Sequence, residues 1–141
     1  MTRIAFRIAG CLVLLMLPSY VFAQQCLHGA NSADDQKARK REALSAMRQI
    51  NTLQANRPEA RQGKFLSQTE MAVYYADLTK NTPARQPLIF DPASDVLPGW
   101  QLTLDKTENG YWFMIKDKTD PCGFAYVSNE RGVIFTAEPI R

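Results

Sequence analysis

The residues best suited to chemistry lie near the start of the chain, at Cys26 and His28. His28 is the only histidine of the 141 residues, and it stands two positions after a thiol. A catalytic thiol needs such a base within hydrogen-bond reach. The residues around this pair are few, polar and include glycine, so little is expected to hold a catalytic geometry there. We therefore interpret the pair as one half of a disulfide beside an incidental histidine.

An alternative is kept open for His28. A small secreted enzyme or ligand-binding protein could combine it with carboxylates such as Asp91 or Asp117, provided that a concave pocket brings them together. Cys26 and His28 with nearby aspartates match no recognised metal-ligand spacing. The sequence also contains no Gly-rich phosphate loop, no Gly-x-Ser-x-Gly turn and no CxxC pair. We predict no catalytic, cofactor-binding or metal residue, no cofactor, and a protein that is not an enzyme.

The first residues have the three-part pattern of an export signal. Arg3 and Arg7 are followed by an apolar run over 8–16, and Ala23 ends the segment with a small residue. This pattern predicts a signal peptide over residues 1–23 that is cleaved after Ala23, and hence a periplasmic or secreted protein without a transmembrane segment in the mature chain. Lipidation of Cys11 is a minor alternative, because most of the apolar run follows that cysteine.

The mature chain over 24–141 has the length of one domain. Two of the 17 Lys and Arg residues lie in the leader, so 15 remain against 14 Asp and Glu, a net charge of +1. This charge gives no strong attraction to nucleic acid or anionic membranes. Cys26 and Cys122 remain as an even pair, which in an exported protein predicts a disulfide.

One long helix is predicted over residues 31–56. Ser32 and Asp35 have the spacing of a capping box, and Pro58 ends the run. The segment 34–42 is nearly all charged, so only the second half is expected to pack on the core. The apolar stripe of that half consists of Ala43, Leu44, Met47, Ile50 and Leu53.

A short second helix is predicted over 68–78, with Ser67 and Glu70 as its capping box. The proline-rich segment 79–99 is expected to be an extended loop, in which the apolar residues 88–90 reach the core.

From Trp100 onward the hydrophobic period changes to two. Strands are predicted at 100–105, 111–116, 123–128 and 133–137, joined by short turns. The expected fold class is α+β: the long helix and the short second helix pack on one face of a four-stranded antiparallel sheet.

This order of elements, with the segments 43–52, 75–78 and 131–134, resembles the type IV pilin and type II secretion pseudopilin superfamily over about residues 43–137. The resemblance implies a pilin-like two-layer sandwich. A filament subunit would carry Glu where Leu15 stands and an apolar shaft where 34–42 is charged, and a charged shaft is costly to bury. We therefore expect a soluble relative and not a filament subunit.

Basic residues on the first helix suggest another alternative, a surface for DNA or an anionic polymer. Asp34, Asp35 and Glu42 dilute this charge, and a helix with both signs is usually a solvated face. Nucleic acid is therefore not the expected partner. The possible basic stripe consists of Arg39, Lys40, Arg41 and Arg48.

Aromatic residues concentrate in the predicted sheet, and a single helix covers only one of its faces. Either the loop 79–99 covers the aromatic residues of the other face, or they form an exposed binding surface. We expect an exported, non-enzymatic interaction or structural module, which binds another exported or cell-envelope protein through exposed aromatic residues. Its oligomeric state stays open. The possible interaction surface consists of Trp100, Tyr111, Trp112, Phe124 and Tyr126.

Overall fold

The computed structural model describes residues 26–28, 32–82 and 84–138. The predicted signal peptide over 1–23, with its cleavage position and Cys11, lies outside the described residues. Within the described ranges no helix is long and apolar enough to cross a membrane.

The first helix, α1 (Asp34–Ala55), lies within the range 31–56 predicted for one long helix. The predicted capping box at its start is wrong: Ala33 is the N-cap residue, and no side chain caps the helix. The buried residues of α1 all lie from Ala43 onward, as expected, but the charged half also reaches the core: Arg39 lies over the Trp100 ring and Lys40 over the Phe124 ring. The buried residues of α1 are Ala43, Ala46, Met47, Ile50, Leu53 and Gln54.

A short 3-10 helix, η1 (Pro58–Gln62), leads to the second helix, α2 (Gln68–Thr79). The predicted capping box of α2 is confirmed. The backbone N–H of Ser67 donates to Glu70 Oε2 at 2.7 Å, and the backbone N–H of Glu70 donates to Ser67 Oγ at 3.4 Å. These two bonds satisfy backbone groups at the start of the helix that have no partner within it.

The sheet contains β1 (Trp100–Lys106), β2 (Tyr111–Asp117), β3 (Ala125–Asn129) and β4 (Ile134–Ala137). All neighbours are antiparallel, and the strand order is the chain order. The predicted four-stranded antiparallel meander, and with it the α+β class, is confirmed.

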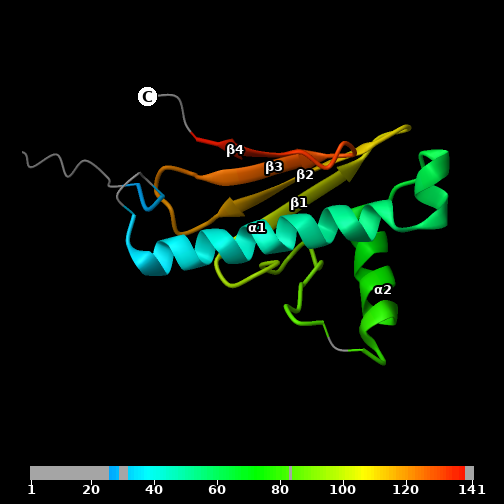
Figure 1. Cartoon of the computed structure of the whole chain (residues 1–141), viewed down its shortest axis with the longest axis horizontal. Coiled ribbons are helices and arrows are strands. Elements are labelled where there is room, and N and C mark those ends of the chain that lie inside the picture. The colour runs from blue at the N-terminus through cyan, green and yellow to red at the C-terminus, as the bar shows by residue number, and fades with distance from the viewer. Residues whose placement is uncertain (1–25, 29–31, 83, 139–141) are drawn as a thin grey trace, which may run out of the picture.

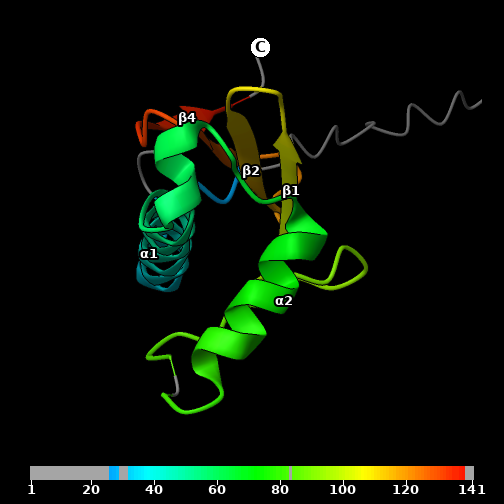
Figure 2. The same cartoon turned by 90° about the vertical axis from the view of Figure 1, so that its right-hand side faces the viewer.

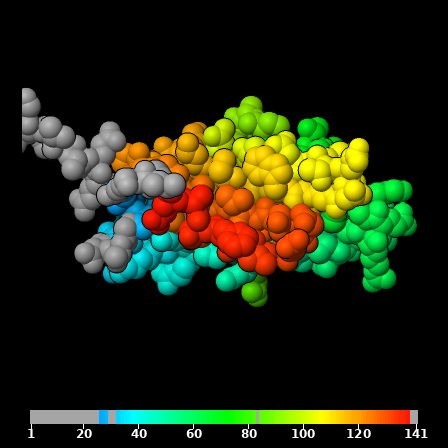
Figure 3. Space-filling model, turned by 90° about the horizontal axis from the view of Figure 1, so that it is seen from above, coloured from blue at the N-terminus to red at the C-terminus, as the bar shows by residue number. Residues whose placement is uncertain are grey.

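Both helices lie below the sheet in Figures 1 and 2. Helix α1 runs along the sheet, and α2 contacts the edge strand β1. Polar side chains tie the two layers together. Asn51 Oδ1 on α1 accepts from the Tyr111 hydroxyl at 2.9 Å, and Gln68 Oε1 on α2 accepts from the Leu104 backbone N–H at 3.2 Å. The opposite face of the sheet is covered by neither helix (Figure 3).

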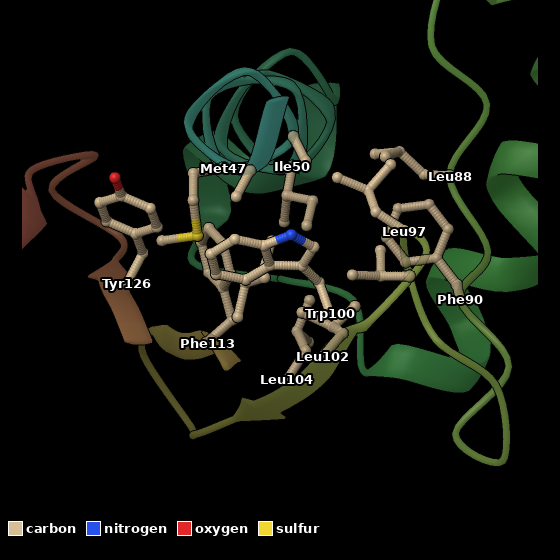
Figure 4. Packing of buried hydrophobic residues seen from close by; sticks show 14 of the residues in the cluster. Met47, Ile50, Leu88, Phe90, Leu97, Trp100, Leu102, Leu104, Phe113 and Tyr126 are labelled. Carbon is tan, nitrogen blue, oxygen red and sulfur yellow. The ribbon is translucent and has the colours of Figure 1, made fainter. Parts of the chain in front are cut away.

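Figure 4 shows the centre of the core, where the Trp100 indole lies beneath Met47 and Ile50 of α1. The loop before β1 also contributes, as predicted: Leu88 and Phe90 are buried, while Ile89 between them is half exposed.

Four of the five aromatic residues expected to form an interaction surface are buried instead. Trp100, Tyr111, Phe124 and Tyr126 are only 1–3% exposed, whereas Trp112 is 39% exposed. The reason is the two-residue alternation of strands. Tyr111 and Phe113 point toward the helices, and Trp112 between them points away. Alternation therefore places Trp112 on the opposite face of the sheet from Tyr111 and Phe113.

Candidate functional site

The outer face of the sheet, on the side away from the helices, carries a row of apolar side chains. The strand register places Met114 opposite Val127, and Val127 opposite Phe135. Met114 and Val127 are partly buried by their neighbours, while Phe135 is 57% exposed. We call Trp112, Met114, Val127 and Phe135 the outer apolar row. Figure 3 looks onto this face, with β4 in red and β3 in orange.

A second candidate site surrounds Asp117 at the end of β2, whose side chain is fully buried. His28 Nε2 lies 2.6 Å from Asp117 Oδ2 and donates to it, because an ionised carboxylate only accepts. Asp117 Oδ1 accepts from Arg39 Nη2 at 3.0 Å and from the backbone N–H and hydroxyl of Thr119 at 2.8 and 2.7 Å. Asp117 thus contacts the segment 26–28, α1 and the β2–β3 loop.

The pKa of Asp117 is lowered from its ordinary value. Burial alone acts in the opposite direction and is the largest single influence, but hydrogen bonds from Thr119 and His28 and the charge of Arg39 together outweigh it. Asp117 is therefore ionised at neutral pH, and the side chains of Arg39, His28 and Thr119 all contact it.

The segment 26–28 is fixed in place by two further contacts, a disulfide and a hydrogen bond to Asp120. The predicted disulfide between Cys26 and Cys122 is confirmed, with Cα atoms 5.2 Å apart. Asp120 Oδ1 accepts from the backbone N–H groups of Leu27 and Cys122, each at 3.1 Å. The expectation that little holds a geometry around His28 is therefore wrong, because a long-range disulfide and a buried carboxylate hold it.

The His28 ring packs against two aromatic residues. Its centroid lies 4.4 Å from that of Phe124 and 5.7 Å from that of Trp100. Cys26 is part of the disulfide, so the thiol and base arrangement considered for Cys26 and His28 does not exist in this structure.

The structure brings together only one of the two carboxylates considered with His28. Asp117 is its direct partner, whereas Asp91 is turned toward its own loop and accepts from the Ala93 backbone N–H. No group of three or more His, Cys, Asp or Glu side chains suited to a metal ion occurs within the described ranges.

The proposed basic stripe is divided by the fold. Arg39 turns inward to Asp117 and Thr119, and Lys40 Nζ lies 4.7 Å from the centroid of the Phe124 ring. Arg41 and Arg48 are exposed. The four residues therefore do not form one continuous cationic surface.

Sequence reasoning missed Arg39, Thr119 and Asp120 as parts of the Asp117 site. The signal for the last two is local, since Asp-x-Thr and Asp-Pro-Cys favour side-chain to backbone hydrogen bonds in turns. No local signal points to Arg39, which lies 78 residues from its carboxylate.

No protein-family model, curated protein or solved structure matches this chain.

Proposed function

We propose that the mature chain is an exported, non-enzymatic interaction module of pilin-like two-layer architecture, and that its partner is another exported or cell-envelope protein. The observation that supports the proposal best is the outer apolar row. Trp112 and Phe135 are exposed large apolar side chains on one sheet face, and partly buried Met114 and Val127 connect them. A contiguous apolar surface of this kind is typical of protein interaction sites.

Burial of these side chains against a partner gives a favourable free energy of association. Apolar surface removed from water contributes about 25 cal/mol per Å². Trp is also a residue type that commonly dominates binding energy, since its large rigid surface loses little conformational entropy. Trp112 and Phe135 are therefore the expected anchors.

The role of an exported protein rests on the leader and the disulfide. An oxidising compartment is where the Cys26 to Cys122 bridge forms and persists. The chain recovered from its host without reductant should have the mass of residues 24–141, less two hydrogens. A chain that begins at Cys11 and carries lipid would replace this proposal with a membrane-anchored protein.

Photocrosslinking in the native host tests the interaction face. A photoreactive phenylalanine analogue replaces Trp112 or Phe135, and the control replaces Val73, which is 70% exposed on α2. We expect a discrete crosslinked product from positions 112 and 135 and none from position 73. No product from the two sheet positions, or an equal product from the control, contradicts the proposal.

A further inference from the structure

A shallow depression of about 440 Å³ lies beside the Asp117 site, where the N-terminal half of α1 runs next to β3. It is on the helix side of the sheet and shares no residue with the outer apolar row. Its polar lining residues are His28, Ser32, Lys37, Lys40, Arg41 and Tyr126.

The charge of this depression is positive. Three of its lining residues are cations, and no Asp or Glu is among the described residues that line it. Lys37 pairs with Asp34 at 3.0 Å, but the Asp34 side chain is 95% exposed, where such pairs are weak. Lys40 and Arg41 form no ion pair with any described residue. The depression therefore favours an anion.

His28 supplies an independent observation that points to a ligand. Its side chain is 1% exposed, and its Nδ1 atom is buried without a hydrogen-bond partner in the described part of the chain. The two nitrogens of an imidazole ring point in widely different directions, so Nδ1 faces away from Asp117, which holds Nε2. A buried polar atom without a partner is costly. A ligand that forms a hydrogen bond with Nδ1 would remove that cost.

We propose that this depression binds a phosphate or sulfate group, either as the free ion or as a monoester. The two lysines, Arg41 and the hydroxyls of Ser32 and Tyr126 are hydrogen-bond donors around one space. A carboxylate offers two oxygens, whereas a phosphate or sulfate offers three or four and can accept from donors on several sides. The open side of the depression leaves room for the body of an ester.

Titration of the full mature chain with sodium phosphate, sodium sulfate and sodium acetate at low salt tests this site, with amide chemical shifts as the readout. We expect saturable shifts at residues 40, 41 and 126, with acetate binding about ten-fold more weakly because it uses fewer of the donors. Glycerol phosphate, which is a monoester, distinguishes an ester ligand from the free ion. Tighter binding than inorganic phosphate indicates a monoester ligand, and equal binding indicates the free ion.

The paired variant K40Q/R41Q removes two of the three cations and should weaken phosphate binding about ten-fold or more. R131Q is the matched control, because Arg131 is an exposed cation on the β3–β4 turn, and it should bind as the wild type does. R41Q alone, at an exposed position, serves if the paired variant does not fold. No saturable shift at about 10 mM phosphate, or equal binding by the wild type and the lining variants, overturns the proposal.

Discussion

His28 and Asp117 lie 89 residues apart in the sequence, and their side chains meet at 2.6 Å in the interior of the protein. Arg39 completes the contact from α1. Three parts of the chain therefore converge on one buried carboxylate: the segment that carries Cys26, the first helix and the end of β2. A buried charge of this kind is stable only while its partners remain in place.

Replacement of Asp117 by Asn is expected to lower the free energy of unfolding by about 3 kcal/mol, because it leaves Arg39 and His28 without a charged acceptor in a buried site. Urea unfolding at neutral pH measures this loss. Asp77→Asn is the control: the pair between Asp77 and Lys80 is exposed on α2, so its loss should move the unfolding midpoint little. Equal midpoints for the two variants would show that the Asp117 contacts contribute no stability.

The same carboxylate predicts a pH dependence. The pKa of Asp117 is lowered in the folded protein, while in the unfolded chain it returns to its ordinary value of 3.8. The stability that comes from its ionised form is therefore present above that value and is lost as the pH falls through the lower folded pKa. Below about pH 4, Asp117→Asn should show a shallower loss of stability than the wild type.

Tyr111 predicts a loss of stability at alkaline pH. Burial, followed by the charge of Glu130, raises the pKa of Tyr111 from 10.0 to about 12. Its contribution is complete below pH 10 and is lost as the pH rises toward 12, because only the unfolded chain ionises this phenol in that interval. Tyr111→Phe should be about 1 kcal/mol less stable at neutral pH, since it loses the hydrogen bond to Asn51, but flatter above pH 10. A phenolate absorbance titration that shows Tyr111 ionising near 10 in the folded protein would refute this.

Local patterns predicted the elements of the fold well. The capping box of Ser67 and Glu70 is a contact between residues three apart, and the alternation along β1 and β2 reflects the geometry of each strand by itself. The start of α1 was mispredicted from the same kind of pattern. Ser32 and Asp35 have the spacing of a cap, but the helix begins two residues after Ser32.

The candidate sites depend on contacts that no local pattern reports. The sequence named Asp117 as a possible partner of His28, but nothing near Arg39 indicates that it turns inward to a carboxylate 78 residues away. The exposure of the aromatic residues likewise could not be predicted from local patterns alone. Alternation separates Trp112 from Tyr111, but only the position of α1 in space determines which of the two faces is covered.

The disulfide predicts a large difference in stability between oxidised and reduced protein. Cys26 and Cys122 close a loop with a sequence separation of 96, and such a bridge restricts the unfolded chain by about 4 to 5 kcal/mol in the chain-entropy model. Denaturation with and without reductant measures this difference. The C26S/C122S variant should match the reduced wild type and should not respond to reductant. A reductant effect of the same size in that variant would contradict the assignment.

The two tryptophans of the sheet form a matched pair for separating core from surface. Trp100 is 1% exposed beneath α1, so Trp100→Ala should leave a cavity and lower the free energy of unfolding by about 3 to 5 kcal/mol. Trp112 is 39% exposed on the outer face, so Trp112→Ala should cost no more than about 1 kcal/mol. Urea unfolding of both variants measures the difference.

If Trp112→Ala is as destabilising as Trp100→Ala, the outer face packs against another part of this chain and is not free to bind a partner. A folded Trp112→Ala protein that no longer forms the crosslink from position 135 would place the loss in the partner contact itself.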